Sequence, residues 1–164
     1  MPEELSRQHR CGSGRLLRNR RGVVGLSLAA IGSLGVVALY QTGIIERVPE
    51  PPLPYLDADE VDAATEAYEV LEIPDTVLGI ASYALTAVLA AGGEGKGYPG
   101  PLDRPVLTAK VAFDAAQAGK LPLEQWTEHR AFCLRCLCAA GASFATAPLV
   151  IPEAHAVPAG LVRR

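Results

Sequence analysis

Two cysteines separated by two residues are the groups in this sequence whose type and spacing point most directly to chemistry. Cys133 and Cys136 lie in the run Phe-Cys-Leu-Arg-Cys, directly before a long apolar stretch. On a helix, this spacing places two thiols one turn apart, where they can close a disulfide or pass electrons. If the helix begins near Ala131, the positive end of its dipole favours a thiolate in the first turn. The sequence therefore predicts a redox-active dithiol, and the alternative is a pair of small buried hydrophobes.

The other cysteines and the nearest histidine are not expected to form a second reactive site or a metal site. Cys138 lies about 200° around the helix from Cys136, and Cys11 belongs to the basic N-terminal segment, so we predict that neither joins the pair. A structural zinc site takes four ligands, and only His129 is close to the pair in sequence. We therefore predict no metal.

Four apolar segments are expected to hold the pair in a membrane. Hydrophobic residues make up 49% of the chain and charged residues 20%, and the mean hydropathy is +0.20. Residues 22–45 carry no charge and are long enough to cross a hydrocarbon core of ~30 Å. Further spans are predicted at about 74–93, 103–119 and 131–152. The third contains Lys110 and Asp114, whose i,i+4 spacing lets them pair on one face; if this segment does not insert, the chain is a two- or three-span anchor.

The distribution of charge predicts the orientation of these spans. Six arginines lie between Arg7 and Arg21, and ten acidic residues lie between Glu46 and Asp75. By the positive-inside rule, the tail 1–21 is cytoplasmic and the acidic loop is extracytoplasmic. Four spans return the tail 153–164 to the cytoplasm and place the cysteine pair at the oxidising surface. We expect the membrane to be a bacterial inner (plasma) membrane. A signal peptide is the alternative for the first span, but the apolar core is too long and no cleavage site follows it.

The acidic loop is predicted to carry a short capping helix over the mouth of the bundle. Prolines make its first part extended, and residues 59–71 read as an amphipathic helix with Val61 on the apolar face. Its carboxylates do not follow the order of a calcium loop, so we expect a solvated acidic face. The residues of that face are Asp57, Asp59, Glu60 and Asp62.

Two stretches of the sequence resemble the vitamin K epoxide reductase-like membrane proteins. One is the Phe132-to-Cys136 run at the start of the last span, which looks like the active-site CxxC of that family. The other is the acidic stretch from Asp59, which is followed by the motif Ile-Pro-x-x-x-x-Gly-x-x-x-Tyr at the start of the second span. Gly79 and Tyr83 are the glycine and the tyrosine of this motif. The resemblance covers roughly residues 22 to 152 by our reading of the spans.

This resemblance implies a fold and a reaction. It implies an all-α, integral membrane four-helix bundle with a short extracytoplasmic capping helix, which couples quinone chemistry to disulfide formation. A quinone of the ubiquinone or menaquinone type would lie near the external ends of the second and fourth spans. Cys136 would face it, and an exposed Cys133 would exchange with a separate thioredoxin-like thiol partner. Asp75, Gly79, Tyr83 and Phe132 are the residues expected to bind the quinone.

The sequence also departs from the family pattern. Family members carry a second cysteine pair in the external loop, whereas residues 46–75 contain no cysteine. A tyrosine that animal members place four residues after the CxxC is Ala140 here, and Asp75 replaces a neutral polar residue that hydrogen-bonds the quinone. The prediction is therefore a membrane-embedded thiol–disulfide oxidoreductase using Cys133 and Cys136. The alternative is a non-catalytic bundle that serves as a binding or assembly subunit. We expect a lipid bilayer around the protein and no nucleic-acid partner.

Overall fold

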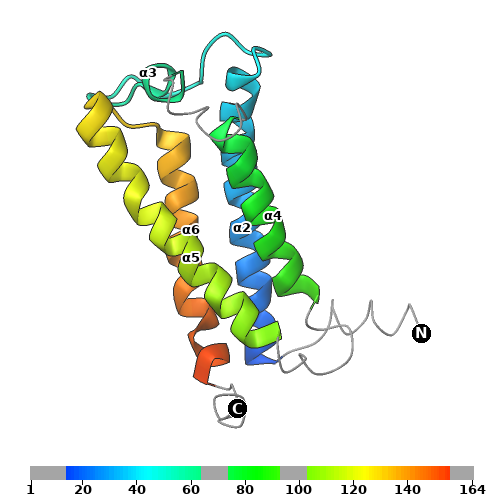
Figure 1. Ribbon diagram of the computed structural model, residues 1–164. Coiled ribbons are helices and arrows are strands. Elements are labelled where there is room, and N and C mark those ends of the chain that lie inside the picture. Colours follow the sequence, from blue (N-terminus) through cyan, green and yellow to red (C-terminus); the bar gives the residue numbers. More distant parts are fainter. Residues whose placement is uncertain (1–13, 64–73, 93–102, 156–164) are drawn as a thin grey trace.

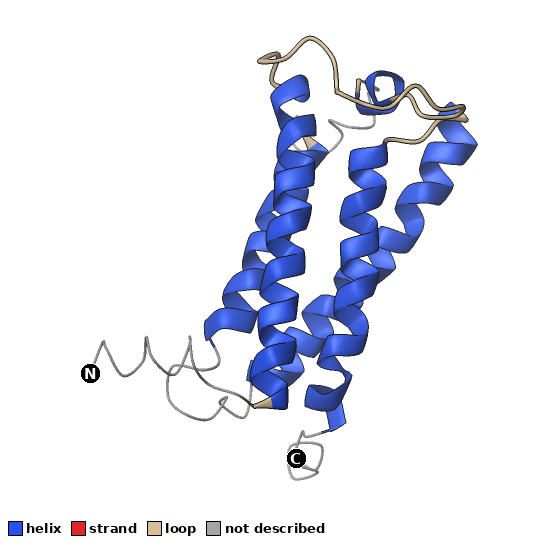
Figure 2. Ribbon diagram, turned by 180° about the vertical axis from the view of Figure 1, so that it is seen from behind, coloured by secondary structure: helices blue, strands red, loops and turns tan. Residues whose placement is uncertain are grey.

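The computed structural model describes residues 14–63, 74–92 and 103–155, and its architecture is an antiparallel bundle of four long helices (Figure 1). The chain runs up and down the bundle in sequence order, so α2 begins and α6 ends at the same end. The predicted all-α bundle is confirmed, and every regular element of the described residues is helical (Figure 2). The four long helices are α2 (Arg15–Gln41), α4 (Asp75–Gly92), α5 (Asp103–Glu124) and α6 (Leu134–His155).

A fifth, short helix closes the opposite end of the bundle. Helix α3 (Ala58–Asp62) lies across that end, as the predicted capping helix should (Figure 1). The Asp57 side chain accepts a hydrogen bond from the backbone N–H of Glu60 and so caps the helix N-terminus. The rest of the predicted amphipathic segment, residues 64–71, lies outside the described residues.

The long helices of the bundle pack around two apolar clusters. Helix α2 packs against α4 and α6, and α5 packs mainly against α6. One apolar cluster lies toward the α3 end and contains both Cys133 and Cys136; the other lies toward the chain ends and is centred on Leu107 and Val111. The buried cysteines are thus part of the apolar interior at one end of the bundle.

Three of the long helices are long and apolar enough to cross a membrane: α2, α4 and α6. The predicted Lys110–Asp114 pair does form within α5, with side chains 14% and 9% exposed. The Lys110 ammonium also donates to the hydroxyls of Ser82 and Thr86 on α4, at 2.8 and 3.1 Å. Lys110 and Asp114 therefore satisfy each other inside the bundle, and insertion of α5 stays a prediction.

The ends of α2 and α6 are joined by a buried ion pair. Arg20 donates two parallel hydrogen bonds to the carboxylate of Glu153, at 2.7 and 2.6 Å, and both side chains are 3% exposed or less. The helices extend beyond the predicted spans here, because α2 begins at Arg15 and α6 continues to His155. Arg20 and Glu153, which were expected in the two cytoplasmic tails, therefore connect α2 to α6.

Candidate functional site

The cysteine pair lies where α6 begins. Cys133 immediately precedes the helix, and its carbonyl accepts the N–H of Leu137 at 3.0 Å. Its sulfur accepts the N–H of Cys136 at 3.3 Å, so the sulfur caps a backbone donor that would otherwise lack an intrahelical partner. The Cys133 sulfur is therefore held against the first turn of α6 by this hydrogen bond.

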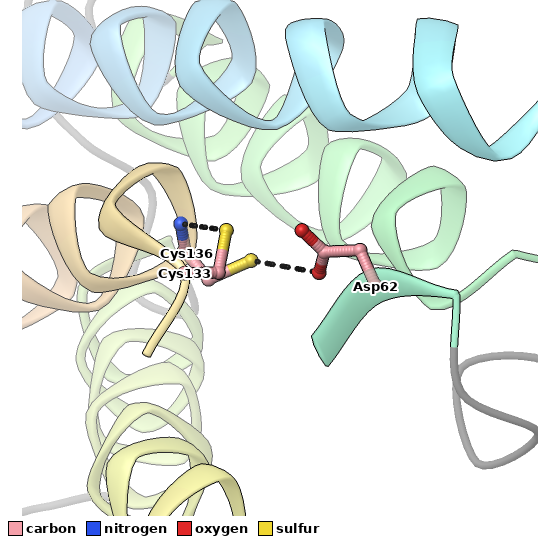
Figure 3. Close-up of side chains that lie close together, drawn as sticks. All are labelled: Asp62, Cys133 and Cys136. Atoms are coloured by element: carbon pink, nitrogen blue, oxygen red, sulfur yellow. Dashed lines mark hydrogen bonds between the residues drawn. The ribbon is translucent and has the colours of Figure 1, made fainter. Parts of the chain in front are cut away.

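The thiol of Cys136 has a different partner, which comes from the capping helix. It donates to Oδ1 of Asp62 at a sulfur–oxygen distance of 3.5 Å (Figure 3). One ligand atom each from Asp62, Cys133 and Cys136 all lie within 4.8 Å of one another. A closed structural zinc site takes four ligands, and the described residues add no fourth to this group. The arrangement is that of a dithiol with a carboxylate beside it.

The prediction of a solvated acidic face is wrong for Asp62. Asp57 and Glu60 are exposed as expected, but Asp62 is 3% exposed. The buried residues of α3 are Ala58, Val61 and Asp62, and the helix lies across the end of the bundle (Figure 1). Helical periodicity gave no signal for this residue, since the position of the helix over the cysteines is a tertiary feature.

Burial changes the acidity of this carboxyl group. The pKa of Asp62 is raised from its usual 3.8 to about 6. Desolvation by burial is the largest cause, hydrogen bonds with Cys133 and Cys136 oppose the rise, and the nearby carboxylates of Asp75 and Glu50 add to it. The group is therefore close to half-ionised just below neutral pH. A carboxyl group in this range can both accept and return a proton under physiological conditions.

The loop before α3 covers the cysteine pair. Residues Leu56 and Phe132 form an isolated parallel bridge, in which the Phe132 N–H donates to the Tyr55 carbonyl at 2.7 Å and the Asp57 N–H donates to the Phe132 carbonyl at 3.2 Å. The carboxylate of Glu50 accepts the N–H groups of Leu134 and Ala58, at 2.6 and 2.8 Å. This carboxylate therefore ties the start of α6 to the start of α3. We call residues 48–62 the cover.

The cover contradicts the prediction that Cys133 is exposed. Cys133 is 0% exposed and Cys136 is 4% exposed, so an external thiol does not reach either sulfur in this arrangement. The backbone N–H of Cys133 donates a hydrogen bond to the side-chain oxygen of Gln125 at 3.4 Å. Gln125 begins the π-helical turn η2 (Gln125–His129), which follows Pro122 and ends at Arg130 in a left-handed conformation. Cys138 is exposed, which agrees with its predicted direction away from the pair, and Cys11 lies outside the described residues.

A cavity of about 410 Å³ lies among the four long helices, and Cys136 lines it. Asp75, Gly79 and Tyr83, three of the residues predicted from the resemblance, line it too. The side chain of Asp75 accepts a hydrogen bond from the Gln41 amide at 3.0 Å. The Tyr83 hydroxyl lies 2.8 Å from the carbonyl of Ala139, to which it donates, and is thus held against α6. Of the two cysteines only Cys136 lines the cavity, and no residue of the cover does.

Phe132, the fourth predicted quinone-binding residue, does not line this cavity. It stacks on Trp126 with ring centroids 5.6 Å apart, and Tyr55 meets the same indole edge-on at 5.7 Å. The guanidinium of Arg130 lies 5.4 Å from the indole centroid. Phe132 thus belongs to an aromatic cluster that fastens the cover to η2.

Sequence reasoning missed three residues of this site: Asp62, Glu50 and Gln125. Each lies in a loop, a short helix or an irregular turn, where hydropathy and periodicity give little information about direction. A sequence signal for Asp62 is absent, because its partner is 74 positions away.

A sequence model of the vitamin K epoxide reductase family matches residues 22–151, which includes all of the site described above. Neither the curated proteins nor the solved structures contain a match to this chain.

Proposed function

Because the chain belongs to the vitamin K epoxide reductase family, whose members are membrane oxidoreductases, we propose that it is a membrane-embedded thiol–disulfide oxidoreductase that couples Cys133 and Cys136 to a quinone. The observation that carries this proposal is the position of Cys136. Cys136 lines a cavity between the helices, and its sulfur is within 4.8 Å of the sulfur of Cys133. One thiol can thus face a bound acceptor while the other stays beside it to close a disulfide.

The cavity suits an aromatic acceptor of moderate size. Small-molecule sites have volumes of about 300–1,000 Å³ and combine apolar walls with a few polar groups. Here apolar side chains such as Leu34 and Phe113 line the walls together with Asp75 and Tyr83. A bound quinone supplies an acceptor for two electrons and two protons, and the dithiol supplies both when it becomes a disulfide. Asp75, Gly79 and Tyr83 are the residues that would hold the ring of a ubiquinone or a menaquinone.

The second substrate is proposed to be a thioredoxin-like dithiol on the extracytoplasmic side of a bacterial inner membrane. This orientation rests on the six arginines between Arg7 and Arg21, four of them in the first turns of α2, and on the acidic residues of the cover. Since the cover lacks cysteines and encloses Cys133, the partner must exchange with Cys133 directly after the cover opens. The opening of the cover is therefore part of the proposed cycle.

Thiol trapping tests this proposal. The protein is reduced in lipid nanodiscs, mixed with a short-chain ubiquinone or menaquinone, quenched with acid and labelled with a maleimide, so that oxidised and reduced pairs are separated by mass. We expect quinone to oxidise the wild-type pair, and to leave Cys133→Ser and Cys136→Ser without an intramolecular disulfide. Cys138→Ser is the matched control, because Cys138 is exposed and points away from the pair, and it should behave as wild type. A wild-type pair whose redox state ignores quinone would support the non-catalytic bundle instead.

A further inference from the structure

A buried carboxylate beside a reacting thiol is an unusual feature of this site. Asp62 is 3% exposed, yet it makes no ion pair with a basic side chain among the described residues, and its Oδ2 atom has no hydrogen-bond partner there. Burial of an ionised carboxylate is costly unless opposite charges or donors compensate it. The donor that this carboxylate does have is the thiol of Cys136, at 3.5 Å. Asp62 is therefore buried at a cost in free energy, and the side-chain donor that it contacts is that thiol.

We propose that Asp62 is the proton-transfer residue of the cysteine pair: its carboxylate accepts the proton of Cys136 when the pair is oxidised, and its acid form donates a proton to Cys136 when the pair is reduced. This inference rests on the proposed function, and it adds a catalytic residue from the cover to the two cysteines. Asp62 touches a reacting sulfur, so it acts on that atom directly (Figure 3).

The oxidation step balances as follows. The Cys136 thiol gives its proton to the Asp62 carboxylate, which leaves a thiolate and a carboxylic acid. The two sulfurs form the Cys133–Cys136 bond and lose two electrons, and the quinone takes these electrons together with two protons to become the hydroquinone. The two protons equal those lost by the two thiols, and Asp62 ends the step as a carboxylate again.

The reduction step uses the same group in the opposite sense. A thiolate of the external dithiol attacks the sulfur of Cys133, forming a mixed disulfide while the Cys133–Cys136 bond breaks. Cys136 leaves as a thiolate and takes a proton from protonated Asp62, which makes it a better leaving group. The second thiol of the partner then attacks the partner's own sulfur in the mixed disulfide. This forms the disulfide of the partner and releases the sulfur of Cys133. The proton of the first external thiol protonates Asp62 and passes from it to Cys136, and the proton of the second external thiol goes to Cys133. Both protons of the external dithiol thus end on the pair, and Asp62 is a carboxylate again.

The electrostatic surroundings of Asp62 fit this exchange. The groups that face it are Cys133 and Cys136 at the start of α6, Asp75 at the start of α4 and Glu50 from the cover. Burial first, and then the two carboxylates, hold the pKa of Asp62 at about 6, while the thiols lower it. The carboxylate form that accepts a proton therefore predominates above about pH 6, and the acid form that donates one predominates below it.

The pH dependence of single-turnover oxidation tests the inference. Reduced protein in nanodiscs is mixed with a short-chain quinone between pH 5 and 8.5, and disulfide formation is followed by thiol trapping. Positioned general acid–base groups contribute about 10²–10⁴-fold to a rate, so Asp62→Asn should oxidise at least about 10²-fold more slowly at pH 7. The wild-type rate should fall as pH drops through about 6, and this inflection should be missing in Asp62→Asn. Asp62→Glu should recover part of the rate and restore an inflection. Glu60→Gln is the matched control, since it removes an exposed carboxylate from the same short helix.

Two further measurements separate the possible failures. Infrared difference spectra of the wild-type protein, reduced minus oxidised by dithiothreitol exchange, should contain a carboxyl band that titrates near pH 6; this readout needs neither a variant nor a quinone. If quinone oxidises the wild type and Asp62→Asn keeps the same rate and inflection, the role of Asp62 is refuted while the proposed function stands. If Asp62→Asn does not fold, absence of the carboxyl band refutes that role. If quinone does not oxidise the wild type at all, the proposed function fails, and the infrared titration still decides whether Asp62 exchanges a proton with the pair.

Discussion

The buried Arg20–Glu153 pair predicts a large and non-additive effect on stability. The pair connects the first turns of α2 to the last turn of α6 by two hydrogen bonds of 2.7 and 2.6 Å, and the side chains are 3% and 1% exposed. Removal of one partner leaves the other charge buried without compensation, which typically costs about 3–5 kcal/mol. Glu153→Gln and Arg20→Met should therefore each lower the free energy of unfolding by that amount.

The double variant should be far less damaging than the sum of the single changes. When both partners of a buried ion pair are replaced by apolar residues of similar volume, the result is often neutral or stabilising. Arg20→Met with Glu153→Leu should thus recover most of the loss, with a coupling free energy of about 3 kcal/mol or more between the two positions. Both positions are at the end of the bundle opposite α3, so the reactivity of the cysteine pair should not change.

Equilibrium unfolding in mixed micelles, with increasing sodium dodecyl sulfate and helical content as the signal, measures these free energies. Lys120 and Glu124 form the matched control, because they are also an ion pair but their side chains are 64% and 51% exposed. Glu124→Gln should cost about 0.5 kcal/mol or less, as surface pairs do. Single Arg20 and Glu153 variants that unfold like this control, or a double variant as unstable as the sum of the singles, would show that the buried pair is not a stabilising unit.

Two further predictions concern the cover and the polar network of α5. Glu50→Gln weakens the charge-assisted hydrogen bonds to the first N–H of α6 and to α3, each worth about 1.5–3 kcal/mol. Maleimide should therefore label Cys133 at least about tenfold faster than in wild type or in the control Glu60→Gln, and an unchanged rate would mean that Glu50 does not hold the cover closed. Lys110→Met leaves Asp114 without its cation and should lower the free energy of unfolding by about 3–5 kcal/mol. Adding Asp114→Leu should restore most of it, and a double variant no better than the single one would count against a compensated pair.

The sequence by itself determined most of the fold. Uncharged stretches and their lengths identify the helices of the bundle, because a chain in lipid must satisfy its backbone groups within each helix. The i,i+4 spacing predicted the Lys110–Asp114 pair, since the positions of near neighbours on a helix follow from local geometry. The Cys-Leu-Arg-Cys run placed two thiols at the start of α6 for the same reason.

Only the tertiary structure decided what surrounds the cysteine pair. The exposed Cys133 of the sequence prediction is 0% exposed, and Asp62, expected in solvent, is buried beside Cys136. The physical reason is that burial depends on which distant segment packs over a residue. No local pattern states that a loop after α2 folds back across the start of α6, 74 positions later in sequence. The sequence thus specifies a dithiol in a membrane bundle, while the fold adds the carboxylate next to it and the cover above it.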